Sequence, residues 1–112
     1  MPYEKRQIIE AHFEGNAHPA VIISANEVYL QERYYICAML TSSNSQDRFS
    51  FNLRDGDTIK PLTKETQVRL QLIGIVKDEE IIRNNHHNSL TVEAFDRLID
   101  SLAEKVFGVA FM

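Results

Sequence analysis

The stretch QVRLQL, residues 67–72, alternates polar and apolar side chains at every position. One set comprises Val68, Leu70 and Leu72, and the other comprises Gln67, Arg69 and Gln71. An extended strand sends successive side chains to opposite faces, so the apolar set is predicted to enter a core. The other face holds Arg69 between two amides. Facing water, it is an ordinary solvated surface; lining a groove, it can hold an anion.

Similar patterns extend outward from this strand. Strands are predicted over residues 7–14, 19–24, 34–41 and 49–53, and the opening strand over residues 66–72 is predicted to continue to residue 76, past a bend or bulge at Gly74. Ser24 and Glu27 have the spacing of a capping box, which predicts a short helix toward Gln31. The Asp55-Gly56 pair predicts a turn.

A longer helix is predicted to begin at Thr91 and to end the chain. Its apolar residues follow the three-and-four spacing of an amphipathic helix: Val92, Phe95, Leu98, Ile99, Leu102 and Val106. This stripe is expected to lie on the sheet. The strand connections are short, which favours antiparallel pairing. The predicted fold is therefore mainly β: a small barrel or strongly bent sheet of about five to seven mostly antiparallel strands with a C-terminal helix.

Length and composition favour one soluble domain over residues 1–112, because the 112 residues are 44% hydrophobic and 25% charged. A net charge of −4 argues against broad wrapping of duplex DNA. Eight basic and eight acidic residues lie between Lys5 and Arg69, whereas four basic and seven acidic residues lie from Leu70 onward. An anion-binding face is therefore expected in the first two thirds of the chain.

The sequence contains neither a signal-peptide pattern nor a membrane-spanning run, so we expect a cytoplasmic protein. Cys37 is the single cysteine, and its apolar neighbours predict a buried, inert thiol. Phosphate-binding loops and common metal motifs are missing, so no cofactor and no metal are expected. His86 and His87 are interpreted as loop residues, and residues 78–80 as a solvated acidic run or a short turn.

The remaining polar residues form a constellation. His18 precedes a strand, Thr41, Ser42 and Ser43 follow another, and Arg69 lies on a third. The pieces HPAVIIS, YYICAMLTSS, FSFNL and QVRLQLIGIV occur in this order before the amphipathic helix. In that order they resemble the PemK/MazF family of toxin endoribonucleases, which includes Kid, and the resemblance spans nearly the whole chain.

The resemblance implies an SH3-like barrel that acts as a homodimer, cuts single-stranded RNA without a metal and is neutralised by an antitoxin. It also implies that Arg69 is catalytic and that Thr41, and less directly Ser42, contribute to the site. Many members carry Arg-Pro where this chain has His18-Pro19, and some carry an acid at the position of Gln71. Many also have a longer, Gly-rich loop between the first two strands.

The residues suit the chemistry of metal-free RNA cleavage, in which the 2′-hydroxyl attacks the phosphate. Arg69 can offer paired donors to phosphate oxygens, and His18 can act as general base or acid because imidazole titrates near neutrality. Thr41 is expected to assist at the phosphate by hydrogen bonding. The expected RNA-binding residues are Ser42, Ser43, Gln67 and Gln71. Alternating aromatic residues in the predicted strands are interpreted as core rather than as base-stacking groups.

Two other functions remain open at this stage. A CcdB-like toxin shares this kind of barrel, inhibits a protein target such as gyrase and depends on C-terminal residues, and this chain ends in the apolar GVAFM. A barrel that binds RNA without cutting it is the second alternative. Discrete RNA fragments formed in the presence of a chelator distinguish the endoribonuclease from both.

Overall fold

The computed structural model covers residues 1–112 and describes residues 3–13, 15–42, 45–82 and 87–109. In this part of the chain, seven strands form one sheet with antiparallel neighbours. The strands are β1 (Gln7–Phe13), β2 (Asn16–Ile22), β3 (Tyr34–Thr41), β4 (Ser50–Asn52), β5 (Gln67–Lys77), β6 (Ile81–Ile82) and β7 (Asn88–Ser89). The helices are α1 (Asn26–Glu32), the 3-10 turn η1 (Asp78–Glu80) and α2 (Val92–Lys105).

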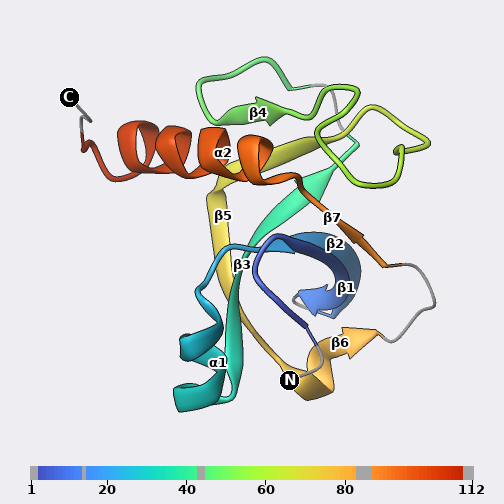
Figure 1. Cartoon of the computed structure of the whole chain (residues 1–112), viewed down its shortest axis with the longest axis vertical. Coiled ribbons are helices and arrows are strands. Elements are labelled where there is room, and N and C mark those ends of the chain that lie inside the picture. Colours follow the sequence, from blue (N-terminus) through green and yellow to red (C-terminus); the bar gives the residue numbers. More distant parts are fainter. Residues whose placement is uncertain (1–2, 14, 43–44, 83–86, 110–112) are drawn as a thin grey trace.

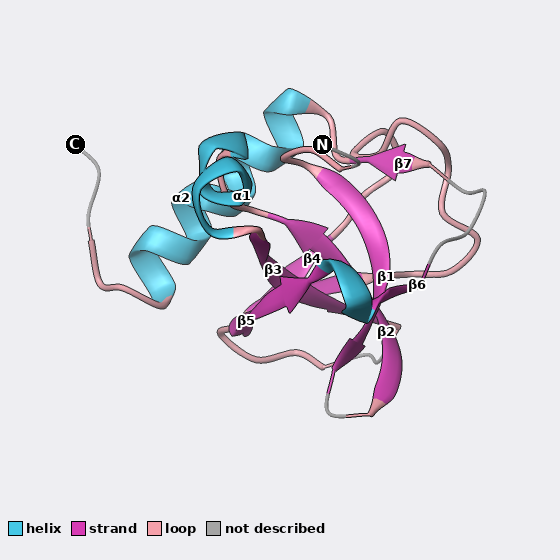
Figure 2. Ribbon diagram, turned by 90° about the horizontal axis from the view of Figure 1, so that it is seen from below, coloured by secondary structure: helices cyan, strands magenta, loops and turns pink. Residues whose placement is uncertain are grey.

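The strand order is β4-β5-β3-β2-β1-β6, and β7 also pairs with β1. Figures 1 and 2 show that the sheet is strongly bent and that β1 and β2 curve along their length. The predicted mainly β fold with a terminal helix is confirmed. Among the described residues the sheet does not close into a complete barrel, because the ladder ends at β4 on one side and at β6 on the other.

Two apolar clusters lie on opposite faces of the central strands. On β3, Ala38 and Leu40 pack in the cluster beneath α2, whereas Tyr35 and Cys37 belong to the cluster beside α1. This alternation follows from the two-residue period of a strand. Both helices therefore cover the sheet, with α2 across one end in Figure 1 and α1 at the opposite end. The predicted burial of Cys37 is confirmed, since its side chain is fully buried.

Helix α2 begins as predicted. Thr91 is its N-cap, and the Thr91 hydroxyl accepts a hydrogen bond from the Ala94 N–H (3.2 Å). Buried residues of α2 are Ala94, Phe95, Leu98 and Leu102. Val92, by contrast, is 58% exposed although it follows the same spacing. The helix also binds the turn before residue 58, because Arg97 forms an ion pair with Asp57 at 2.8 Å.

The pairing of β3 with β5 changes register in the middle of the opening stretch. Met39 pairs with Arg69, but the adjacent Ala38 pairs with Ile73. Residues 70–72 of β5 therefore have no partner on β3, which is how a bulge bends a strand. Gly74 pairs regularly with Cys37, so the predicted irregularity lies earlier in the strand. The predicted burial of Leu72 is wrong, because its side chain is 45% exposed on this bulge.

The beginning of α1 also differs from the prediction. The short helix exists, but its N-cap is Ala25, which makes no side-chain capping bond. Ser24 instead accepts a hydrogen bond from the Ile36 N–H (3.0 Å) and thereby attaches the helix to β3. The predicted loop residue His86 lies outside the described residues, as does Ser43 of the candidate site. Within the described ranges, no helix has the length and apolar composition required to span a bilayer.

Candidate active site

The strand register places the candidate side chains on one face of the sheet. Thr41 pairs with Gln67, and Met39 pairs with Arg69. Directly opposed residues of antiparallel strands project from the same face, as do residues two apart on one strand. Thr41, Gln67 and Arg69 therefore share the face opposite to α2. Arg69 lies two residues along β5 from Gln67, the partner of Thr41, which corresponds to roughly 7 Å between the Cα atoms of Gln67 and Arg69 at strand spacing.

His18 joins this face from β2. Ala20 of β2 pairs with Met39, and continuing that register by two residues brings His18 beside Thr41. The two residues also line one groove of about 760 Å³, which confirms their proximity independently of the register. Neighbouring strands are separated by about 4.8 Å, so the side chains of His18 and Thr41 are within reach of one bound group.

The groove is bounded by strand ends on one side and by the segment before β5 on the other. Its lining comprises residues Ile8, Ile9, Glu10, His18, Pro19, Leu40, Thr41, Ser42, Pro61, Leu62, Thr63, Lys64, Thr66 and Asn88. Among these residues, Lys64 provides the permanent positive charge. Its ammonium forms no ion pair within the described part of the chain. The sequence does not single out Lys64, because its loop acquires a place in the groove only through folding.

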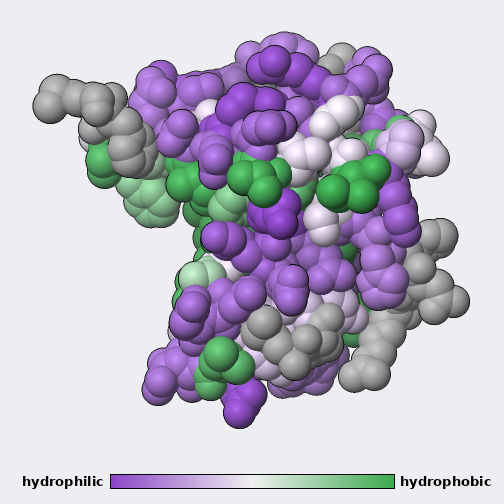
Figure 3. Space-filling view, viewed as in Figure 1, coloured by the Kyte–Doolittle hydropathy of each residue, from purple (hydrophilic) through white to green (hydrophobic). Residues whose placement is uncertain are grey.

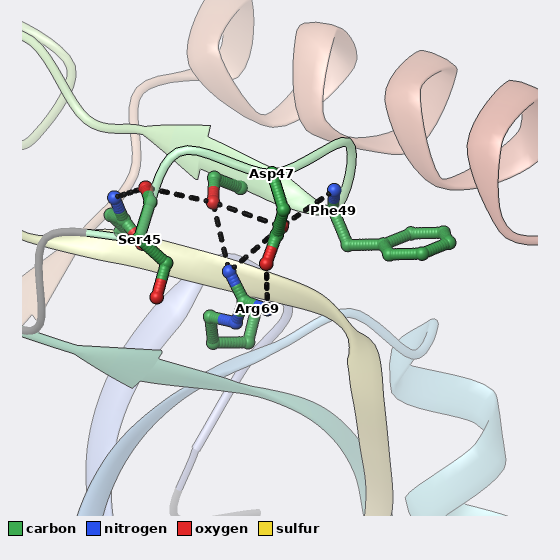
Figure 4. Close-up of polar contacts among 6 residues, drawn as sticks. Ser45, Asp47, Phe49 and Arg69 are labelled. Carbon is green, nitrogen blue, oxygen red and sulfur yellow. Dashed lines mark hydrogen bonds and ion pairs between the residues drawn. The ribbon is translucent and has the colours of Figure 1, made fainter.

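Arg69 lies beside this groove, and its guanidinium is bound by the Asp47 carboxylate and the Ser50 hydroxyl. Its Nη1 donates to Asp47 Oδ1 (3.1 Å) and to Ser50 Oγ (2.8 Å), and its Nη2 donates to Asp47 Oδ2 (2.9 Å). Figure 4 shows the Asp47 carboxylate facing the two terminal nitrogens of the guanidinium. The arginine side chain is 11% exposed and the Asp47 side chain 51% exposed. The candidate cation is therefore already paired within the chain.

The ion pair affects the Asp47 carboxyl group. The hydrogen bond from Arg69 holds the pKa of Asp47 below its ordinary value, against the opposing effect of desolvation, and the Phe49 N–H also lowers it. Asp47 is therefore ionised at neutral pH. Sequence spacing gives no sign of this contact. Asp47 lies in the connection between β3 and β4, and Ser50 begins β4, so the two residues are 22 and 19 positions from Arg69 in the sequence.

Gln67 performs a structural task in this arrangement. It is 4% exposed, and its Nε2 donates to the Ser45 carbonyl (2.6 Å), which attaches the segment after β3 to β5. The Gln67 Oε1 is buried and has no hydrogen-bond partner among the described residues. Gln71, by contrast, is exposed on the bulge and does not continue the Thr41 and Arg69 face in regular register. The predicted row of three polar side chains is thus interrupted after Arg69.

Other reactive groups lie apart from the groove. Cys37 is fully buried, and burial raises the pKa of its thiol to about 12, which makes it a poor nucleophile at neutral pH. Tyr35 belongs to the second apolar cluster, and Phe49 and Phe51 pack against the first, so these aromatic residues serve the core as predicted. Within the described ranges, no group of three or more His, Cys, Asp and Glu side chains is arranged to hold a metal ion.

The fold is that of a small bent-sheet protein whose polar face carries His18, Thr41 and Arg69 beside a groove. Residues 4–106 match the family described as PemK-like, MazF-like toxin of type II toxin-antitoxin system, and the chain belongs to that family. The match leaves only a few residues at either end outside, which confirms the resemblance seen in the order of the strands. No curated protein matches the sequence at a significant level.

Solved structures agree with this assignment at the level of the fold. A mycobacterial endoribonuclease in complex with its cognate antitoxin superposes with a TM-score of 0.78 at 17% identity, over 98% of this chain and 99% of that one. A second mycobacterial endoribonuclease gives 0.77 at 17% identity, over 100% and 97%. A MazE-MazF structure from Deinococcus radiodurans gives 0.70 at 12% identity, over 96% and 97%.

Proposed function

We propose that this toxin-family protein is an endoribonuclease that cleaves single-stranded RNA by attack of the 2′-hydroxyl, without a metal ion. The observation that carries the proposal is the common face of His18, Thr41 and Arg69, with the first two in one groove. We expect one phosphodiester bound along this face to contact an imidazole, a hydroxyl and a guanidinium. These groups supply proton transfer, positioning and charge stabilisation.

Each residue has a distinct role in the proposed reaction. His18 accepts the proton of the 2′-hydroxyl or donates one to the leaving 5′-oxygen. Arg69 stabilises the charge that develops on the phosphate, because its planar fork matches two phosphate oxygens. Thr41 donates a hydrogen bond to the same phosphate. Ser42, which also lines the groove, contacts the neighbouring nucleotide, and exposed Gln71 contacts RNA beyond the bulge.

The proposed partners follow from the family and the surface. An antitoxin protein neutralises the enzyme; the complex of a similar mycobacterial endoribonuclease with its cognate antitoxin supports this. We also propose a homodimer that acts in the cytoplasm. Exposed apolar side chains on β5 and after α2 support self-association: Leu72 (45%), Ile75 (54%), Phe107 (66%) and Val109 (49%). Figure 3 shows hydrophobic surface beneath α2 toward its C-terminal end.

The CcdB-like alternative is not favoured. The chain matches the PemK-like and MazF-like toxins, and the similar solved structures include endoribonucleases. The apolar C-terminus that motivated the alternative lies partly outside the described residues, because residues 110–112 are not described.

The decisive experiment is incubation of the purified protein with a long single-stranded RNA in the presence of a chelator. We expect discrete fragments with 5′-hydroxyl ends and 2′,3′-cyclic phosphate ends, because an attacking 2′-hydroxyl remains attached to the phosphate. Mapping the ends also identifies the preferred bases. Intact RNA, or fragments that require added metal, would refute the proposed reaction.

Replacing Lys64 by glutamine is expected to weaken RNA binding by about three- to ten-fold and to lower the dependence of log Kd on log salt by roughly 0.7, the contribution of one phosphate contact on a single strand. The reason is that Lys64 lines the groove of His18 and Thr41 and has no carboxylate partner among the described residues. Fluorescence anisotropy with an uncleavable 2′-O-methyl RNA at several salt concentrations measures both quantities.

Lys105→Gln is the matched control for this variant. It removes the same charge from the last turn of α2, at a residue that is not among those lining the groove. If Lys64→Gln and Lys105→Gln change binding equally, Lys64 has no specific contact with RNA and only the net charge matters.

A further inference from the structure

The contacts of Arg69 define a complete anion site. A guanidinium has five N–H donors, and its paired terminal donors are those that match two oxygens of a phosphate. Here Nη1 binds both Asp47 Oδ1 and Ser50 Oγ, and Nη2 binds Asp47 Oδ2. The Asp47 carboxylate thus occupies the fork that a phosphate requires, with two oxygens in the positions of two phosphate oxygens (Figure 4).

Because the arginine side chain is only 11% exposed, little of the guanidinium remains for a second anion while Asp47 is bound. A phosphate and a carboxylate carry the same sign of charge, and placing both on one guanidinium is unfavourable. The proposed reaction needs Arg69 at the scissile phosphate. The two requirements are compatible only when the carboxylate leaves the fork.

We infer that Asp47 is a built-in competitor of RNA: its carboxylate fills the anion site formed by Arg69 and Ser50, and an RNA phosphodiester displaces it. The inference rests on the proposed function and specifies how its site is regulated. Displacement leaves the carboxylate in water, and an ion pair with a half-exposed carboxylate contributes little net free energy. Ser50 Oγ remains beside the guanidinium as a further hydrogen-bonding group for the incoming phosphate.

The geometry argues against a role for Asp47 as general base. Both carboxylate oxygens accept hydrogen bonds from Arg69, and Oδ1 also accepts from the Phe49 N–H (3.0 Å) and lies 3.2 Å from the Ser50 hydroxyl. The same contacts lower the pKa of Asp47, which weakens it as a base. The two roles lead to different expectations for a variant without the carboxylate charge. Loss of a competitor strengthens RNA binding, whereas loss of a general base lowers the cleavage rate.

Asp47→Asn is the test. The amide retains an oxygen that can accept from the Phe49 N–H, but it loses the charge that holds Arg69. We expect the full-length variant to bind an uncleavable 2′-O-methyl RNA about five-fold more tightly than the wild-type protein, the ratio that corresponds to a weak ion pair. Asp55→Asn removes an equal charge from an exposed turn and should change the affinity less than two-fold.

The double variant Asp47→Asn with Arg69→Gln shows whether the effect passes through the arginine. The gain from Asp47→Asn should vanish in the Arg69→Gln background. An Asp47→Asn variant that binds RNA equally or more weakly would overturn the inference, as would a gain that persists without Arg69. Asp47→Ser, whose hydroxyl can also accept from the Phe49 N–H, replaces the asparagine variant if that variant does not fold.

A second measurement separates this inference from the proposed function. Inorganic phosphate at constant ionic strength should raise the Tm of Asp47→Asn more than that of the wild-type protein, because a ligand of the folded state stabilises it more at a given concentration the tighter it binds. Equal shifts would overturn the inference. A larger shift for the variant together with no RNA cleavage by the wild-type protein would support the anion site and refute the endoribonuclease.

Discussion

Replacing Arg69 by glutamine is expected to lower the rate of RNA cleavage by about two to four orders of magnitude, the range for losing a group that stabilises charge or transfers protons in the transition state. Arg69 is the guanidinium on the face that also carries His18 and Thr41. Glutamine keeps a planar polar end but has no charge and no fork. The loss should therefore appear in kcat more than in the affinity for RNA.

The fold should survive this substitution. Asp47 loses its partner, but its side chain is 51% exposed and water can solvate the carboxylate. Urea unfolding followed by circular dichroism should therefore give nearly the same midpoint as for the wild-type protein. Arg48→Gln is the control, because Arg48 is exposed next to Asp47 and makes no hydrogen bond with this face among the described residues. Unchanged cleavage by a folded Arg69→Gln variant would remove Arg69 from the site.

Much of the fold follows from local patterns. The start of α2 at Thr91 is predictable because a hydroxyl cap and an apolar stripe with helical spacing are both local signals. The strand that contains Arg69 is predictable because its alternation has the period of a strand. The family resemblance then adds the order of the strands, which short-range patterns do not give.

The details that decide the site are long-range. The bulge at residues 70–72 depends on how β3 and β5 align, and perfect alternation in the sequence does not reveal it. The same alternation predicts Gln67 as an RNA-binding residue. The structure bonds its amide to the Ser45 carbonyl and also places it beside Ser42 in a second, smaller pocket, an arrangement that local sequence does not reveal. Asp47 and Arg69 meet across 22 positions of sequence. The roles of His18, Thr41 and Arg69 in catalysis stay predictions.

Replacing Asp57 by alanine is expected to lower the free energy of unfolding by about 2–3 kcal/mol, the cost of losing charge-assisted hydrogen bonds at a buried acceptor. The Asp57 Oδ2 accepts from the Arg54 N–H and from Arg97 Nη2, each at 2.8 Å, and its side chain is 8% exposed. These bonds join the turn at residues 54–57 to α2. This turn lies shortly before residues 61–64, the groove segment, which lines the groove and contains Lys64. The Thr91 N–H also donates to the Asp57 carbonyl, a bond that alanine retains.

This contribution depends on pH in a definite direction. Burial by itself raises the pKa of Asp57, but the hydrogen bonds from Arg97 and from the Arg54 N–H outweigh burial and hold that pKa below its ordinary value. A carboxyl group with a lowered pKa stabilises the folded state above its unfolded pKa of about 4, and the contribution is lost as the pH falls through the folded value. The stability difference between the wild-type protein and Asp57→Ala should therefore be full at pH 7 and shrink below about pH 4.

Urea unfolding of both proteins between pH 3 and pH 7 measures this difference. Asp55→Ala is the matched control, because Asp55 lies in the same turn but is exposed, and we expect it to change stability by less than about 0.5 kcal/mol. A loss for Asp57→Ala no larger than that of the control would show that the link between the turn and α2 is weak. In that case the position of the groove segment with Lys64 must depend on its other contacts, such as the hydrogen bonds between Lys60 and Asn88.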